Sequence, residues 1–441
     1  MKALPSIAIA ILCIAGHGEH CLAQSAAQDQ APMPGRGNAR AIAISRGSAI
    51  VRFSVQFLLR QAATIQSKTL KAETIDAIGN PSVCIRHRAG LSMFAKSAIL
   101  KQLLDSGLAG EKDSHDFSAG LMGGIFPPVL DEGGNCPRLP QPFSAAPGST
   151  FNGHHSYPGG LAVHEANNEI SAINLARQYR RLYGADLAPA RSQHSPSRGK
   201  SPPAKDTAEM FISQDVMVAA PIWHDWAKAI VLQWNADGSE FPELNFAGNG
   251  ATDNYGNPGD SKTGAHHILG LAETMKRNLP PDLVITQASA HASPTLGNEY
   301  KVVNWLRAAA IVAQIDPVSA GYLTLDKEGN LRLPALRRLF SIDLNSASPS
   351  QPSLLAEYSL HNLSDSDFTY SAPAVLSAQL ILQNLATDFG YDPADVARYN
   401  NHFRNVVLSN LTAEHIFLVY SARGIDGVRS ELQSLRAGHK I

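Results

Sequence analysis

The sequence predicts an all-α, mostly helical protein. Apolar residues recur at helical spacing, for example at Val51, Val55, Leu58 and Leu59, whereas few segments show the period of two that is typical of strands. The chain has 441 residues, which is enough for one large domain or two to three ordinary ones, and for a sizeable buried core. We therefore expect a fold built mostly from helices, with no internal repeat.

The first residues are typical of a secretory signal peptide. Lys2 precedes an apolar run from Ala3 to Ala15, and small residues surround a cleavage point after Ala23. This run is shorter than the ~20 apolar residues that a membrane-spanning helix needs; a buried N-terminal helix is the alternative. We expect residues 1–23 to be removed and the protein to be exported, either to a periplasm or beyond it.

The rest of the chain divides by its patterning. Residues 24–48 form a leader rich in Ala, Gln, Pro and Gly, residues 49–108 have helical patterning, and residues 109–153 are loop-rich because of paired glycines and prolines. Further helices are expected at 160–183, 214–233, 265–277, 280–291, 300–315, 374–389 and 394–411. Two breaks interrupt them, a Pro- and Ser-rich insertion at 186–207 and a Gly-, Asn- and Asp-dense one at 235–264.

Composition limits the partners and the compartment. The chain has 37 Lys and Arg against 38 Asp and Glu, a net charge of -1, which excludes a globally basic nucleic-acid binder and an acidic solvating chain. We expect no membrane span, the sequence carries no strong signal for nucleic-acid binding, and it does not determine the oligomeric state. After removal of residues 1–23 the chain keeps Cys84 and Cys136, which form either one disulfide or two separate thiols.

Four short patterns carry chemistry. They are HHSYPGGLAVH at 154–164, HDWAK at 224–228, the histidine pair 266–267, and His291 followed by Asp316. Imidazole and carboxylate groups are suitable ligands for Mn, Fe, Zn, Ni or Co. Lys228 follows His224 and Asp225 at helical spacing, so its ammonium can approach both, and a cation beside a metal pair is where phosphate oxygens would bind. A single histidine is usually structural, so the order of these residues, and not the total of 16 histidines, supports a metal site.

That order resembles the HD superfamily of metal-dependent phosphohydrolases, and most closely its branch with an HHxYxGGLxxH pattern, which includes bacterial 3′–5′ exoribonucleases. The resemblance implies an HD-type helical bundle over 146–325, preceded by a leader and helical region at 24–145 and followed by a helical region at 326–441. It also implies that His155, His224, Asp225 and Asp316 hold a first metal. Asp225 would bridge to a second metal bound by His267 and His291, Lys228 would contact phosphate, and His164 would support a ligand or face the substrate. Asp225 and Lys228 are then the catalytic residues, whereas His154 and His266 receive no role.

The resemblance implies a function as well. The protein would hydrolyse a phosphomonoester or phosphodiester, including nucleotide-derived esters, with a water activated by one or two divalent transition metals (Mn, Fe, Zn, Ni or Co). Its partner would be a small phosphorylated substrate or a nucleotide. Two alternatives stay open: a non-catalytic exported protein that binds metal or ligand on a diverged HD domain, and a structural helical protein in which the histidines coincide by chance.

Overall fold

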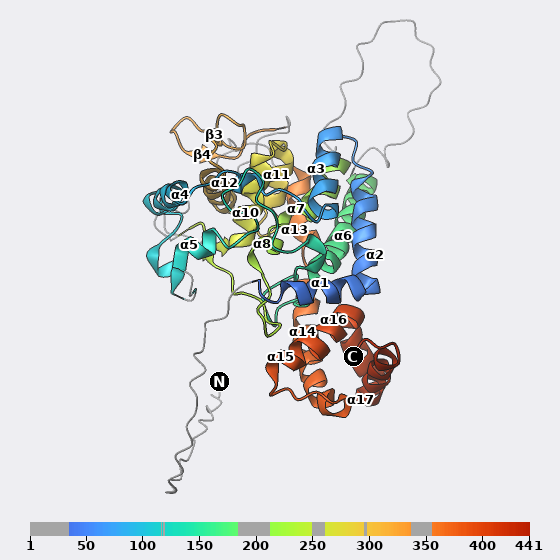
Figure 1. The fold of residues 1–441 in the computed structure, drawn as a ribbon. Helices are drawn as coiled ribbons and strands as arrows, with labels where there is room; N and C mark the ends of the chain where they lie inside the picture. The colour runs from blue at the N-terminus through green and yellow to red at the C-terminus, as the bar shows by residue number, and fades with distance from the viewer. Residues whose placement is uncertain are drawn as a thin grey trace, which may run out of the picture. The chain divides into compact units, whose positions relative to one another are not determined.

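Helices make up nearly all of the regular structure, so the prediction of a mostly helical fold is confirmed in this computed structural model (Figure 1). The structure describes residues 35–115, 117, 120–183, 212–248, 261–294, 298–336 and 355–441. The expected signal peptide at 1–23 and the expected insertion at 186–207 lie outside the described residues, as does the 249–260 part of the second break.

The N-terminal part is a series of helices separated by turns. They are α1 (Asn38–Gly47), α2 (Ala49–Ala62), α3 (Lys68–Gly79), α4 (Met93–Asp105) and α5 (Gly120–Ile125). The side chain of Ser48 caps α2 by accepting a hydrogen bond from the Val51 N–H. One face of α2 then buries Val51, Leu58 and Ala62 against α6 and α3, as the helical spacing of apolar residues predicts.

The central part holds the long helix α6 and the helices that pack around it. Its helices are α6 (Gly160–Tyr183), α7 (Gln214–His224), α8 (Lys228–Val231), α10 (Ala265–Lys276), α11 (Pro281–Ala288) and α12 (Glu299–Ala313). Two short antiparallel pairs accompany them: β1 (Asn245–Phe246) with β2 (Thr263–Gly264), and β3 (Thr324–Leu325) with β4 (Leu331–Arg332). The first pair lies directly before α10 and sets where that helix begins.

The C-terminal part contributes one helix to the centre of the molecule. Its helices are α13 (Ala356–Ser364), α14 (Phe368–Leu385), α15 (Val396–Tyr399), α16 (Asn405–Leu411) and α17 (Ala413–Ala437). Helix α13 packs against α6, α7 and α11, whereas α14 and α17 pack along each other (Figure 1). Residues far apart in the sequence therefore meet around α6 and α7.

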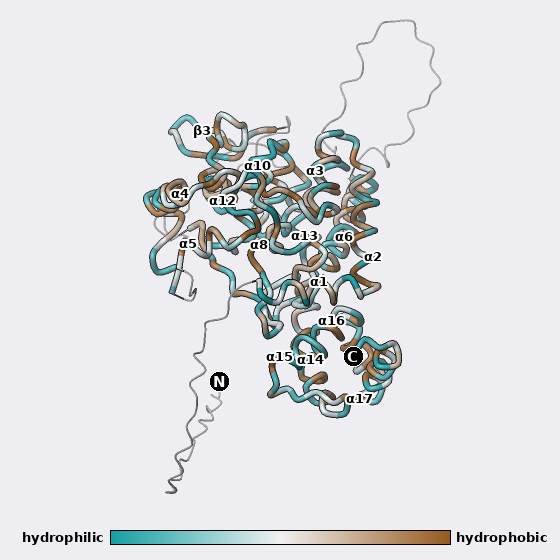
Figure 2. The backbone as a smooth tube through the Cα atoms, viewed as in Figure 1, coloured by the Kyte–Doolittle hydropathy of each residue, from teal (hydrophilic) through white to brown (hydrophobic). Residues whose placement is uncertain are grey.

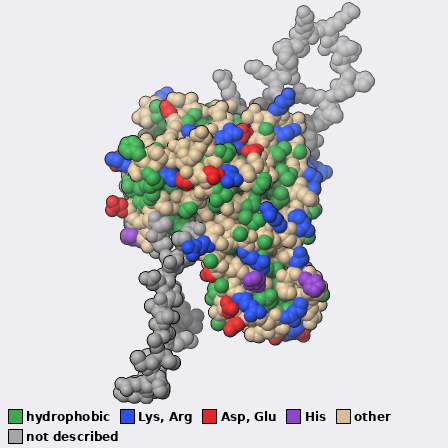
Figure 3. Space-filling model, viewed as in Figure 1, with side chains coloured by type: hydrophobic (Ala, Val, Ile, Leu, Met, Phe, Trp, Pro, Cys, Tyr) green, Lys and Arg blue, Asp and Glu red, His purple; other side chains and the backbone are tan. Residues whose placement is uncertain are grey.

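Burial follows the hydropathy of the chain. Brown and teal alternate along the helices in Figure 2, and the apolar faces meet in one large core that includes the buried Trp223 and Trp226. On the face seen in Figure 3, basic and acidic side chains are interspersed over the surface. Among the described residues, no single helix is long and apolar enough to cross a membrane; α1 and α2 reach that threshold only as a pair bent by 84°.

The two cysteines beyond the expected cleavage point are joined. Cys84 and Cys136 form a disulfide, which decides between the two alternatives that the sequence left open. The carbonyl of Cys84 also accepts a hydrogen bond of 2.8 Å from Arg277 at the end of α10. The disulfide therefore joins two N-terminal loops, and the hydrogen bond from Arg277 ties one of them to the end of α10.

Candidate metal centre

Histidine and carboxylate side chains gather where α6, α7, α10 and α13 meet. They line a cavity of about 430 Å³ together with Ser149, Thr150 and Phe368. The cavity is thus lined by hydroxyl groups, one aromatic ring and ionisable groups.

The pattern at 154–164 folds as a tight turn that leads into α6. Gly159 has a φ of 86°, which is the left-handed region that favours glycine. A Cβ on Gly160 would collide with the carbonyl of His155, so this position also requires glycine. These close approaches start α6 at Gly160 and place His164, one turn further along, over the cavity.

The His224–Asp225 pair lies at the end of α7. Trp223 and Trp226 on either side of it are fully buried, and their indole N–H groups donate to Thr74 and to the Ala77 carbonyl, at 3.1 and 2.9 Å. This anchoring turns both His224 and Asp225 toward the cavity. The side chain of Lys228, at the start of α8, contacts both the Asp225 carboxylate and the Gly148 carbonyl.

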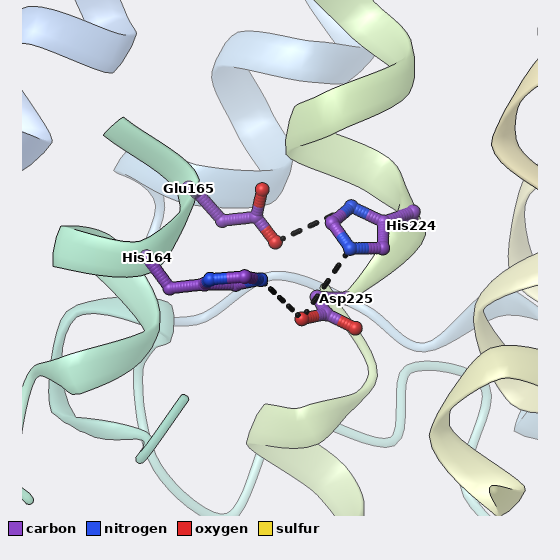
Figure 4. A group of neighbouring side chains, drawn as sticks. All are labelled: His164, Glu165, His224 and Asp225. Atoms are coloured by element: carbon purple, nitrogen blue, oxygen red, sulfur yellow. Dashed lines mark ion pairs between the residues drawn. The ribbon is translucent and has the colours of Figure 1, made fainter. Parts of the chain in front are cut away.

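Four donor groups surround what we call the first metal position: His164, His224, Asp225 and Asp365. His164 Nε2 lies 3.2 Å from Asp225 Oδ2 and 3.2 Å from Asp365 Oδ1. His224 Nε2 lies 3.5 Å from Asp225 Oδ2 and 3.4 Å from Asp365 Oδ2. Ligands in a tetrahedron with bonds of about 2.0–2.1 Å are separated by about 3.3–3.4 Å, and these four distances are close to that value; Asp365 meets His164 with Oδ1 and His224 with Oδ2. Figure 4 shows His164 reaching in from α6 and His224 with Asp225 from the end of α7.

A second metal position shares Asp225. The other oxygen of that carboxylate, Oδ1, lies 3.1 Å from His266 Nε2, and His291 completes a group of three whose ligand atoms lie within 4.8 Å of one another. His266 comes from the first turn of α10 and His291 from the turn after α11. Asp225 therefore faces one position with each oxygen.

Hydrogen bonds hold these histidines with Nε2 toward the carboxylates. His224 Nδ1 donates to the Pro221 carbonyl at 2.8 Å, and His266 Nδ1 donates to Glu243 at 2.6 Å. His164 Nδ1 donates to Asp367 at 3.0 Å. Because carbonyl and carboxylate oxygens only accept, each Nδ1 carries a proton, and Nε2 is the nitrogen that faces the carboxylates and could bind a metal, as in metal-ligating histidines.

The buried atoms of the cluster lack hydrogen bonds of their own. His224 Nε2, His266 Nε2 and Asp225 Oδ1 are buried and make none, although buried polar groups are normally paired; Asp225 Oδ2 is in the ion pair with Lys228. Burial lowers the pKa of His224, but the negative charges of Asp225, Glu165 and Asp365 outweigh burial and raise this pKa to about 10. Both observations describe a site that attracts positive charge, so these residues fit a divalent metal.

Two more carboxylates lie behind the cluster on α6. Glu165 Oε1 lies 3.5 Å from His224 Nδ1 (Figure 4), and burial raises the pKa of Glu165 to about 8 although His224 opposes the shift. Glu169, one turn further, is buried without a hydrogen bond on either oxygen, and its burial and the nearby Glu165 raise its pKa. Glu165 also belongs to a close group with His164, His224 and Asp225.

The structure brings several of the expected residues together. His224, Asp225, Lys228 and His291 all line or border the cavity. His164, which was expected to support a ligand or to face the substrate, lines the cavity and directs Nε2 at Asp225 and Asp365.

Three expected ligands are placed differently. Asp316 is exposed after the end of α12, and its carboxylate accepts hydrogen bonds from Ser319 and from the Val318 N–H. Pro317 disfavours helical geometry at Asp316, and α12 has already ended at Ala313. Asp365, and not Asp316, lies beside His164 and His224.

His155 and His267 contact other residues. His155 uses both ring nitrogens in hydrogen bonds, to Tyr157 and Asp367 at 3.0 and 2.9 Å. His267 stacks on His291 and meets Trp305 of α12 edge-on. Its neighbour His266 takes the expected position because successive residues on a helix point about 100° apart.

Sequence reasoning missed the contribution of the C-terminal part. Asp365 ends α13 and Asp367 begins α14, while His361 on α13 places its ring 5.1 Å from that of His224, centroid to centroid. Glu243, the partner of His266, lies in the expected loop before β1. The one available signal was the short run His361-Asn-Leu-Ser-Asp365-Ser-Asp367, which concentrates ligand types within seven residues.

Comparison of the chain with models of protein families, with curated proteins and with solved structures finds no match. The buried histidine and aspartate cluster in a helical fold is compatible with an HD-type domain.

Proposed function

We propose that the protein is a metal-dependent phosphohydrolase of the HD type that acts on a small phosphomonoester or phosphodiester. The observation that carries the proposal is the convergence of His164, His224, Asp225 and Asp365 beside a cavity, with His224 Nε2 buried and without a hydrogen bond. One or two divalent transition metals would occupy the two positions. Such a metal, when bound, lowers the pKa of water and polarises a phosphoryl oxygen.

The residues of the chain have distinct tasks in this proposal. Asp225 holds the two positions together through its two oxygens, which face His224 and His266 respectively. Lys228 lines the same cavity. Burial lowers the pKa of its ammonium group, but the contact with Asp225 outweighs burial and raises that pKa. Lys228 is therefore a fixed positive charge beside the place where phosphate oxygens would bind.

The hydroxyl groups of the cavity would orient the rest of the substrate. Ser149, Thr150 and Ser366 line the cavity with hydroxyl groups, and Asn362 lines it with an amide. These side chains offer hydrogen bonds without charge, so the charge in the cavity comes from the ionisable cluster and Lys228. This distribution of charge suits a small phosphorylated substrate or a nucleotide better than a partner that needs a long basic surface.

A panel of phosphomonoesters, phosphodiesters and nucleotides, assayed with Mn²⁺, Fe²⁺, Zn²⁺, Ni²⁺ or Co²⁺, tests the proposal. We expect phosphate release with at least one metal and a loss of at least 10³-fold in Asp225→Asn, which keeps the shape of the side chain but removes its charge. Asp316→Asn is the matched control because that carboxylate lies outside the cluster. Bound metal without turnover of any compound would contradict the proposal and favour a non-catalytic metal-binding protein.

We also propose that the protein is exported. The Cys84–Cys136 disulfide supports this, because disulfides persist in oxidising compartments and are rare in the cytosol. Mass spectrometry of the protein from its native host tests both points, since we expect an N-terminus near residue 24 and no free thiol at Cys84 or Cys136. An intact N-terminus with reduced cysteines would contradict export.

A further inference from the structure

Asp367, which belongs to neither metal position, connects His164 of the first position with His155. Its Oδ1 accepts the hydrogen bond of 3.0 Å from His164 Nδ1, and its Oδ2 accepts one of 2.9 Å from His155 Nε2. Asp367 is the residue that precedes α14, yet its side chain makes no capping hydrogen bond to that helix. Its carboxylate is therefore committed to the two histidines.

His155 is held in a conformation that directs it at Asp367. Its φ is 50°, a left-handed value that is uncommon for a residue with a side chain. The His155 carbonyl accepts hydrogen bonds from the backbone N–H groups of Gly148 and Tyr157, at 2.9 and 2.8 Å. The hydroxyl of Tyr157 donates to His155 Nδ1 at 3.0 Å, which leaves the Nε2 proton for Asp367. Strain of this kind persists only where the surroundings determine it, and it is concentrated at functional sites.

We infer that Asp367 and His155 are positioning residues for the first metal position. Because Asp367 can only accept, it keeps the proton of His164 on Nδ1 and directs the Nε2 lone pair toward Asp225 and Asp365. His155 occupies the second oxygen of Asp367 and fixes the angle of the carboxylate. This inference rests on the metal centre that the proposed function requires, and it assigns His155 a role other than that of a ligand.

A third metal position is the competing interpretation of the same residues. His154, His164 and Asp367 place one ligand atom each within 4.8 Å of one another. To bind such an ion, His164 Nδ1 would have to lose its proton. Because Nε2 of the same ring binds the ion at the first position, one imidazole ring would then bind two metals. The hydrogen bond from Nδ1 to Asp367 requires no such deprotonation and explains the same proximity.

Metal binding by the full-length protein separates these roles. Co²⁺ affinity is measured by competition with a chromogenic chelator, and the number of ions bound at saturation by elemental analysis. We expect Asp367→Asn to weaken the Co²⁺ affinity about 10–100-fold, the usual cost of losing such a support, with the number of bound ions unchanged. His155→Asn should cause a smaller loss, because Asp367 then keeps its bond to His164. Asparagine tolerates the left-handed backbone at position 155, so the local fold is preserved.

Asp395→Asn is the control, since it makes the same change at another helix N-cap, that of α15. Its Co²⁺ affinity should equal that of the wild type. Equal affinity in Asp367→Asn would overturn the inference, and so would the loss of one bound ion in His155→Asn or Asp367→Asn, which would make the residue a ligand. A wild type that binds no Co²⁺ overturns the metal centre as well. A wild type that binds Co²⁺ and hydrolyses nothing refutes only the proposed phosphohydrolase activity.

Discussion

Asp365→Ala removes one of the four donor groups of the first metal position, whereas Asp316→Ala removes none. Asp365 lies 3.2 Å from His164 Nε2 and 3.4 Å from His224 Nε2. Asp316 is exposed and accepts hydrogen bonds only within its own turn, from Ser319 and Val318. The two variants therefore compare the ligand that the structure places in the cluster with the one expected from the family pattern.

The magnitude follows from the number of ligands. Four-ligand zinc sites bind with about 10–16 kcal/mol, so one ligand of four accounts for about 2.5–4 kcal/mol. At about 1.4 kcal/mol for each factor of ten, Asp365→Ala should weaken metal binding about 10²–10³-fold. Asp316→Ala should leave the affinity unchanged and lower the stability by less than about 1 kcal/mol, as is usual for an exposed side chain.

The assay is a competition between the dialysed protein and a zinc chelator, carried out for the wild type and both variants. Thermal unfolding of each metal-free protein shows whether a variant is folded before its affinity is compared. The reasoning is refuted if Asp316→Ala loses affinity and Asp365→Ala does not. That result would restore Asp316 as the ligand and show that the end of α13 lies elsewhere.

Three further predictions concern other parts of the structure. His266→Ala should bind one metal ion fewer at saturation, whereas His267→Leu should keep both ions, as measured by elemental analysis. If His267→Leu loses an ion and His266→Ala does not, α10 is rotated from the orientation described. Replacing Cys84 and Cys136 by serine opens a loop with a sequence separation of 52, which should cost about 4 kcal/mol in urea unfolding; a loss below about 1 kcal/mol would mean that the disulfide constrains little. Burial would raise the pKa of Glu273, but its contacts with His87 and Arg277 outweigh burial and lower it from 4.5 to about 2. Glu273 therefore contributes about 3 kcal/mol that is fully present above about pH 5 and lost as the pH falls to about 2. The stability advantage of the wild type over Glu273→Gln should shrink over that range, and a pH-independent difference would contradict the assignment.

The C-terminal part is integral to the candidate site. Asp365 and Asp367 come from either side of the turn between α13 and α14. Further along, Arg404 donates to the Ser156 carbonyl at 3.1 Å, and Ser409 donates to the Pro158 carbonyl at 2.8 Å. The turn that leads into α6 is thus held by residues about 250 positions later in the chain. A truncation before α13 would remove metal donors as well as support.

Local sequence was sufficient for the helical fold and for the centre of the site. Apolar spacing indicates helices wherever one face is buried, because the period of 3.6 residues is a property of the helix itself. His224 and Asp225 are adjacent in the chain, so their proximity needs no tertiary information. The glycine pair at 159–160 marks a close backbone approach for the same local reason.

Tertiary structure decided which other side chains meet them. His266 and His267 are equally good ligands by type, and only the rotation of α10 against α7 places His266 at Asp225. Asp316 and Asp365 are both carboxylates near a helix end, and only the packing of α13 against α6 and α7 brings Asp365 to the cluster. The physical reason is that a metal position needs donors about 3.3 Å apart, and the distance between segments separated by over a hundred residues depends on packing, which no local pattern encodes.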